Sequence, residues 1–229
     1  MTKQNSIRVD RLVVDHHRGD ETIHALNCPA LAIDGGTSAA VIGPSGCGKS
    51  TLLGVLAGLA SPSTGSVLIG KTEITSLSER ERVAFRKTHI GIVYQADNLL
   101  PFLTVTENVR LQLALSDGEA DIEQLLERLG LSGLGDRLPD KLSGGQRQRA
   151  AVARAVVHRP DLIFADEPTG ALDADNAAGV IDVLTELQRD LGATLIIVTH
   201  DRAVAAQMHQ VIQLRAGTVI AEVENSHAR

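Results

Sequence analysis

The sequence lacks the features that would place a protein outside the cell or within a lipid bilayer. Its only two cysteines, Cys28 and Cys47, are too few for a disulfide framework and fit a reducing cytosol. No apolar run approaches the roughly 18–20 uncharged residues that a membrane-spanning helix needs. The first ten residues, MTKQNSIRVD, lack the apolar core of a signal peptide. We therefore expect a cytoplasmic protein with no membrane span of its own.

An excess of positive charge is also absent. The 22 Lys and Arg residues are outnumbered by 28 Asp and Glu, and the formal net charge is -6. Because a general nucleic-acid-binding protein neutralises phosphates with clustered basic residues, we expect no nucleic acid partner. The 229 residues are 43% hydrophobic and 22% charged, which suits one folded domain, or one domain with an inserted subdomain.

Strand signals alternate with helix signals along most of the chain. Helices are expected from Lys49 to Ala60 and from about Asp173 to Leu191. The first two strands are expected to be separated by the turn HHRGD. The expected strands span residues 7–14, 22–33, 38–43, 65–70, 89–95, 161–166, 194–200, 211–215 and 218–223. Such alternation predicts a parallel sheet covered by helices, with ligands beyond the carboxyl ends of the strands.

The composition shifts between about residues 96 and 160 toward Leu, Gln, Glu and Arg at helical spacing. We interpret this stretch as an inserted helical subdomain. The chain is then a single domain, 1–229, whose core comprises about 1–95 and 161–229 and whose helical subdomain comprises about 96–160.

The stretch GPSGCGKST follows an apolar strand and opens a helix. It matches the phosphate-loop pattern through Gly43, Gly48, Lys49 and Ser50. Glycines let backbone N–H groups converge on phosphate, and the helix adds the positive end of its dipole. Lys49 is expected to reach the β- and γ-phosphates, and the Ser50 hydroxyl to bind Mg²⁺. Cys47 also lies inside this loop. We interpret it as a small side chain that fits a tight turn, without a redox role.

The stretch LIFADE places two acids at the end of a second buried strand. An acid is costly there unless it meets a cation, so Asp166 is expected to face Mg²⁺. Glu167 follows directly and could polarise an attacking water as a general base. Gln95 and His200 end two further strands at the same edge. Gln95 could sense metal or water, and His200 could bind the γ-phosphate.

A second glycine loop, within KLSGGQRQRAAVARAV, also opens a helix. Ser143, Gly144 and Gly145 could hold phosphate, although a complete phosphate loop already exists upstream. The following helix carries three arginines, at 147, 149 and 154, which fall largely off its apolar stripe. We interpret them as a solvated or ion-paired face of a packed helix.

Together these elements resemble the nucleotide-binding domain of ATP-binding cassette (ABC) transporters over nearly the whole chain. The five residues LSGGQ (142–146) are the most discriminating part, since other phosphate-loop NTPases lack them. The resemblance implies an α/β fold: a P-loop NTPase core with a mostly parallel sheet, N-terminal antiparallel strands and an inserted helical subdomain.

The resemblance also implies roles for matching positions. Glu167, His200, Gln95 and Lys49 become the catalytic set, while Ser50, Gln95 and Asp166 bind Mg²⁺. The remaining assignments concern ATP. The implied ATP-binding residues are Gly43, Pro44, Ser45, Gly46, Cys47, Gly48, Lys49, Ser50, Thr51, Asp166, Ser143, Gly144, Gly145, Gln146 and Asp173.

One implied role departs from the family pattern. An aromatic residue near the N-terminus stacks on adenine in these proteins, commonly a Tyr. The matching position here is His16, with His17 as the neighbouring alternative. Imidazole offers less stacking surface, so a lower affinity for the base is expected.

The subgroup motifs EPTGALD and NLLPFLTVTENV look like the branch that contains lipoprotein-releasing, macrolide-export and cell-division ATPases. The resemblance implies a head-to-tail homodimer in which each LSGGQ completes the other chain's ATP site. It also implies an integral membrane partner encoded separately, which holds the chain at the inner face of the membrane. We expect the contact near Gln95–Leu103, where the apolar LLPFL could line a docking groove or pack in the core of the insertion. An importer subunit, a soluble ATPase acting on DNA or ribosomes, and a non-hydrolysing regulatory cassette are the alternatives.

Overall fold

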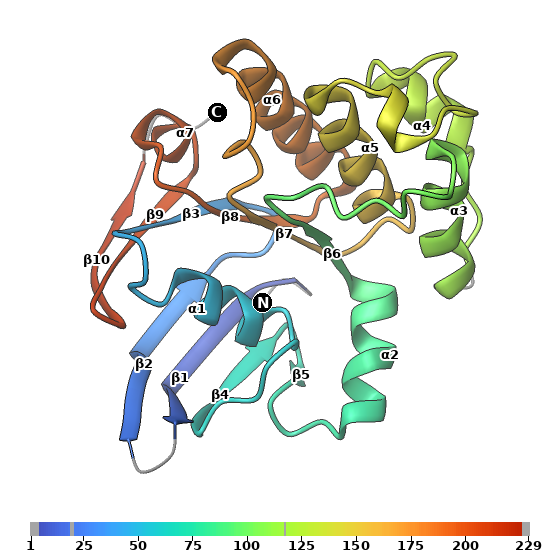
Figure 1. The fold of residues 1–229 in the computed structure, drawn as a ribbon. Coiled ribbons are helices and arrows are strands. Elements are labelled where there is room, and N and C mark those ends of the chain that lie inside the picture. The colour runs from blue at the N-terminus through green and yellow to red at the C-terminus, as the bar shows by residue number, and fades with distance from the viewer. Residues whose placement is uncertain (1–4, 19–20, 117, 226–229) are drawn as a thin grey trace.

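The computed structural model describes residues 5–18, 21–116 and 118–225, which form ten strands and seven α-helices around one continuous sheet (Figure 1). The strand order across the sheet is β5-β4-β1-β2-β10-β9-β3-β8-β7-β6. One half is parallel: β3 (Ser38–Ile42), β8 (Thr194–Val198), β7 (Leu162–Asp166) and β6 (Ile90–Val93) pair in that sense, and so do β3 and β9 (Gln210–Arg215).

The other half is largely antiparallel. β1 (Ile7–Arg18) pairs on its two sides with β2 (Glu21–Ile33) and β4 (Thr64–Ile69). The short strand β5 (Thr72–Glu73) extends this half at one edge, and β10 (Thr218–Glu224) joins it to β9. The expected combination of a mostly parallel core sheet and N-terminal antiparallel strands is confirmed.

Two hydrophobic cores lie on opposite faces of the parallel strands. In β7, Leu162 and Phe164 face one core while Ile163 and Ala165 face the other. β8 alternates in the same way. Because both faces are covered, these strands are apolar at nearly every position instead of alternating with polar residues.

One core contains α1 (Lys49–Leu56) and the antiparallel strands. The other lies beneath α3 (Val105–Leu115), α4 (Ile122–Arg128), α5 (Gly144–Val156) and α6 (Ala174–Leu191). Figure 1 shows these four helices together over one face of the sheet, with α1 beneath the other face. A short 3₁₀ turn, η1 (Pro139–Lys141), precedes α5. No helix in the described ranges is long and apolar enough to cross a membrane.

Several element boundaries differ from expectation. β1 continues through His16 and Arg18, so most of HHRGD belongs to the strand. The helix expected to reach Ala60 ends at Leu56, because Gly58 adopts φ 64° and turns the chain. Two helices were not predicted at all: α2 (Glu79–His89), which ends where a strand was expected to begin, and α7 (Arg202–Ala206).

Candidate active site

A cavity of about 420 Å³ opens at the carboxyl ends of β3, β6, β7 and β8. Six of the residues that line it were singled out from the sequence as chemically active. Its lining comprises Ser45, Gly46, Lys49, Ser50, Thr51, Gln95, Asp166, Glu167, Val198 and His200. The convergence expected at one edge of a parallel sheet is therefore present. Val198 was not predicted, because a buried residue ending an apolar strand carries no separate signal.

The phosphate loop lies between β3 and α1 and takes a conformation that requires glycine. Gly48 has φ 98°, and a Cβ atom there would lie 2.5 Å from the carbonyl oxygen of Ala25 in β2. Lys49 is nearly buried, and its Nζ donates to the carbonyls of Gly43 (2.9 Å) and Pro44 (3.0 Å). The lysine is thus folded back along the loop, at the point where phosphate oxygens could replace the two carbonyls.

Asp166 ends β7 and faces the first turn of α1. The Ser50 hydroxyl donates to its Oδ1 at 3.3 Å. Burial raises the pKa of Asp166 above its ordinary value, the Ser50 hydrogen bond opposes that rise, the neighbouring Glu167 charge adds to it, and the Lys49 charge lowers it. A partly desolvated carboxylate beside a hydroxyl oxygen suits a hard cation such as Mg²⁺.

Side chains alone do not form a complete metal site. Within the described part of the chain, no group of three or more His, Cys, Asp or Glu side chains is placed to hold an ion. This fits a Mg²⁺ that takes hydroxyl and amide oxygens as well as a carboxylate from the protein and completes its shell with phosphate oxygens and water.

Glu167 and His200, which both line the cavity, are within hydrogen-bond distance of each other. His200 Nδ1 lies 2.7 Å from Glu167 Oε2, and the Glu167 side chain is 19% exposed whereas His200 is 74% exposed. Glu167 also adopts φ 47°, which is uncommon for a residue with a Cβ atom, and its N–H donates to the carbonyl of Val198 (2.9 Å). The left-handed turn directs the carboxylate toward His200, a contact that the sequence did not reveal.

Gln95 lies beyond the end of β6 and is exposed. Its amide packs against Gly170, where a Cβ atom would lie 2.8 Å from Gln95 Nε2. The absence of a side chain at Gly170, shortly after Asp166 and Glu167, therefore leaves room for the glutamine side chain.

The second glycine loop does not line this cavity. Ser143 begins α5 instead, in a reciprocal capping box: Ser143 Oγ accepts from the Gln146 N–H (3.2 Å) and Gln146 Oε1 accepts from the Ser143 N–H (2.9 Å). Gly144 is half-buried and Gly145 is buried. In the single chain, then, these four residues lie outside the site that the phosphate loop forms.

Asp173 also lies outside the cavity, as the N-cap of α6. Its carboxylate accepts from the Asn176 N–H (3.0 Å) and from Asn176 Nδ2 (2.8 Å). Asn176 in turn fills the space beside Gly145, where a Cβ atom would lie 2.3 Å from its Oδ1. Asp173 and the LSGGQ turn are therefore packed together through Asn176.

His16 is exposed on β1, opposite Ile23 of β2. It lies on the same strand face as buried Val14, because side chains alternate along a strand. The pair is two residues from Ala25, which contacts the phosphate loop at Gly48. The alternative, His17, has a side chain that lies outside the described residues.

The three arginines of α5 do not form a free basic stripe. Arg147 pairs with Asp97 (3.1 Å), and Arg154 donates to two backbone carbonyls. Arg149 has a buried Nε without a hydrogen-bond partner. The helix is packed as expected, and of the two expected environments, solvated or ion-paired, Arg147 has the ion-paired one.

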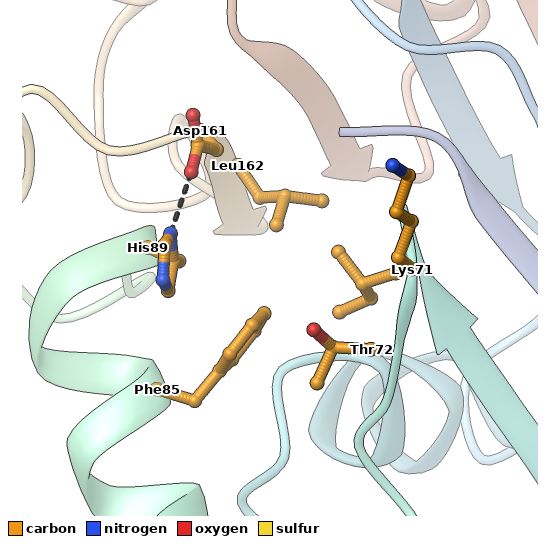
Figure 2. Close-up of a pocket in the computed structure, with 7 residues that line it drawn as sticks. Lys71, Thr72, Phe85, His89, Asp161 and Leu162 are labelled. Atoms are coloured by element: carbon orange, nitrogen blue, oxygen red, sulfur yellow. Dashed lines mark hydrogen bonds and ion pairs between the residues drawn. The ribbon is translucent and has the colours of Figure 1, made fainter. Parts of the chain in front are cut away.

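A second cavity, of about 430 Å³, lies at the opposite end of β7 (Figure 2). Figure 2 shows Phe85 and His89 of α2 on one side and Lys71 and Thr72 on the other, with His89 Nδ1 2.6 Å from Asp161 Oδ2. None of the residues assigned to ATP from the sequence lines it. The candidate phosphate site is therefore the cavity at the carboxyl ends, which candidate residues do line.

Comparison with known proteins identifies the family of the chain. The family model described as ABC transporter matches residues 26–170. The lipoprotein-releasing system ATP-binding protein LolD of Legionella pneumophila (strain Lens) is 41% identical over 92% of this chain and 95% of its own. The macrolide export ATP-binding/permease protein MacB of Burkholderia thailandensis is 42% identical over 92% of this chain, which spans 33% of MacB.

Among solved structures, the ATP-binding cassette MJ0796 matches with a TM-score of 0.88 and 34% identity, over 97% of this chain and 99% of that one. That structure is a dimer in a post-hydrolysis state bound to ADP and Pi. The chain belongs to the ABC transporter family and is an ATP-binding cassette ATPase.

Proposed function

We propose that this ATPase works as a head-to-tail homodimer with two composite ATP sites and drives a separate membrane protein of the export or extraction type. One observation carries the proposal. Lys49, Asp166 and Glu167 line one cavity, whereas Ser143 begins a helix outside it. A chain so built holds half of each site, and a second copy supplies the other half.

Within one chain, the phosphate loop and Lys49 bind the β- and γ-phosphates through backbone N–H groups and the ammonium. Lys49 exchanges its two carbonyl partners for phosphate oxygens. Ser50, Asp166 and Gln95 are the ligands we assign to Mg²⁺, which when bound spreads the charge of the phosphates. His16 and Ile23 provide the surface on which adenine stacks.

Hydrolysis requires a water aligned with the γ-phosphate. Glu167 accepts a proton from that water, and His200, paired with it at 2.7 Å, holds the carboxylate in place and donates toward the γ-phosphate. Gln95 orients the water from the other side. Because phosphoryl transfer depends on positioning and charge stabilisation, an incomplete site is slow.

The partner chain completes the site with LSGGQ. The Ser143 hydroxyl, through its own O–H, and the N–H groups of Gly144 and Gly145 at the start of α5 cap a γ-phosphate held by the other phosphate loop. Asp173, packed beside them through Asn176, reaches the same interface. ATP therefore acts as the contact that holds the dimer together.

A groove of about 370 Å³ offers a place for the membrane partner. It lies between α2, β6, α3 and α5, and its lining combines exposed leucines with basic side chains. The leucines are Leu59, Leu111 and Leu115, and the basic residues are Arg86, Lys87 and Arg154. An apolar helix with acidic residues at its ends fits this chemistry.

The stretch expected to dock the partner divides among three environments. Leu99 packs in the core, Leu100 lines the groove, and Phe102 is 72% exposed beyond it. Docking there would hold the chain at the cytoplasmic face of the membrane. We assign the export or extraction type by analogy with LolD and MacB, which are named for a lipoprotein-releasing system and for macrolide export.

Two variants test the proposal together. Glu167→Gln should bind ATP, lose turnover and accumulate as an ATP-bound dimer in size-exclusion chromatography. Adding Ser143→Arg should leave ATP binding by the monomer intact and remove that dimer. An unchanged turnover in Glu167→Gln would disprove the role of Glu167, and a persistent dimer with Ser143→Arg would disprove the composite site.

A further inference from the structure

The segment Tyr94–Asn98, which contains Gln95, is fastened to α5 by backbone contacts. Gln148 Nε2 donates to the carbonyl of Tyr94, the first residue after β6, at 2.9 Å. The Arg154 guanidinium donates to the carbonyls of the last two residues of the segment, at 3.1 and 2.6 Å. Gln148 is buried, and half-buried Arg154 has a pKa lowered by desolvation. The segment that carries Gln95 is thus attached to the helix that begins at LSGGQ.

A side-chain ion pair adds the most direct link. Arg147 Nε donates to Asp97 Oδ2 at 3.1 Å, and Arg147 Nη1 donates to the carbonyl of Leu142 at 2.8 Å. Leu142 is the residue before Ser143. A single planar guanidinium therefore connects the Gln95 segment to the first residue of LSGGQ, a geometry that lysine cannot reproduce.

The Asp97 end of this link is itself held in one conformation. Its other carboxylate oxygen, Oδ1, accepts from the Leu99 N–H at 3.1 Å, and Asn98 between them adopts φ 50°. The side chains of Arg147 and Asp97 are 36% and 28% exposed, so the pair is only partly screened by water. Each partner therefore has a second hydrogen bond besides their shared contact, Asp97 to the Leu99 N–H and Arg147 to the Leu142 carbonyl.

We propose that Asp97 and Arg147 are positioning residues that couple the two ATP sites of the dimer. This inference rests on the proposed head-to-tail dimer. Gln95 serves the site of its own chain, whereas Ser143 serves the site of the partner chain. The pair joins the two segments by an ion pair of 3.1 Å, so occupancy of one site sets the position of the LSGGQ turn at the other.

Steady-state ATP hydrolysis by Arg147→Met and Asp97→Asn tests the coupling. Wild type should be cooperative, with a Hill coefficient that approaches 2, the number of sites. Each variant should lower the Hill coefficient toward 1 and reduce kcat about tenfold, because a displaced turn no longer fits the partner's γ-phosphate. ATP binding to the isolated chain should change by less than about twofold, since neither residue lines the phosphate cavity.

Arg128→Met is the matched control. Arg128 also pairs with carboxylates, those of Glu186 and Asp190, but it does so between α4 and α6, away from both glycine loops. Its Hill coefficient and kcat should match wild type. Arg147→Lys should behave like Arg147→Met, because charge alone does not hold Asp97 and the Leu142 carbonyl together.

The outcomes separate the two proposals. A cooperative wild type together with fully cooperative Arg147→Met and Asp97→Asn variants would overturn the coupling alone. A wild type that hydrolyses ATP without cooperativity and never dimerises would overturn the dimer and the coupling with it. Thermal unfolding of each variant should show a folded chain, and Asp97→Asn, which keeps the side-chain shape, provides the readout if Arg147→Met unfolds.

Discussion

Asn108 fastens the loop that borders the proposed docking groove, and its replacement by leucine gives a measurable test of the structure. The side chain is fully buried in α3. Its Oδ1 accepts from the Leu100 N–H at 2.8 Å, and its Nδ2 donates to the carbonyls of Leu100 (3.2 Å), Leu103 (3.0 Å) and Thr104 (3.0 Å). Leucine has a similar volume and can make none of these contacts.

The expected loss follows from the donors involved. Asn108→Leu removes the acceptor of the Leu100 N–H and the two amide protons that serve the three carbonyls, which is about three full hydrogen bonds. At about 1 kcal/mol for each net hydrogen bond, the free energy of unfolding should fall by about 3 kcal/mol. For a chain of this size about 1 kcal/mol lowers Tm by about 2–4 °C, so the shift should be about 6–12 °C.

Thermal unfolding followed by circular dichroism measures the shift. Asn27→Leu is the control, since it makes the same substitution at an exposed position of β2 and should change the free energy of unfolding by less than about 0.5 kcal/mol. If Asn108→Leu lowers Tm by less than about 2 °C, the loop is not held by this side chain and the reasoning fails.

Gly48→Ala should weaken ATP binding at least about tenfold, because its Cβ atom would lie 2.5 Å from the Ala25 carbonyl at φ 98°. Gly46→Ala, whose Cβ atom meets nothing within 4 Å at φ 74°, should weaken it less in the same nucleotide titration, and equal losses would refute the steric explanation. His158 has a pKa lowered mainly by burial, although its bond to the Ile90 carbonyl opposes this. As the pH falls through about 6.5, His158 therefore takes up a proton in the unfolded chain before it does so in the folded chain. The free energy of unfolding should decline below that pH. The decline in Tm should be shallower in His158→Gln, and an identical pH profile would contradict the assignment.

The sequence predicted the buried half of the fold better than the exposed half. The runs LIFAD and TLIIV are apolar except for Asp166 and Thr194 at their ends because two cores cover them, and both form strands as expected. Helix α2 escaped prediction because none of its residues is buried, so no apolar period appears. A usable signal was nevertheless present, since Ser78 and Glu81 form the capping box that begins this helix.

The site shows a similar division. Lys49 and Asp166 could be placed from the sequence because each lies at or just beyond the carboxyl end of a parallel strand. Such strand ends converge at one edge of the sheet. The pairing of Glu167 with His200, and that of Asp97 with Arg147, could not. Left-handed backbone occurs at Glu167 in the first pair and at Asn98, next to Asp97, in the second. The sequence gives no signal for this conformation at residues other than glycine.

The C-terminal end of helix α5 packs so closely against β6 that a tilt of the helix would pivot about this contact. A Cβ atom on Gly91 would lie 2.2 Å from the carbonyl oxygen of Ala155, so this helix end has no room to slide across the strand. Ser143 precedes Ala155 by 12 residues, and at about 1.5 Å per residue the arm is about 18 Å long. A tilt of about 10° about this contact would move the LSGGQ turn by about 3 Å. A small change beside β6 could therefore decide whether the LSGGQ turn reaches a phosphate bound to another chain.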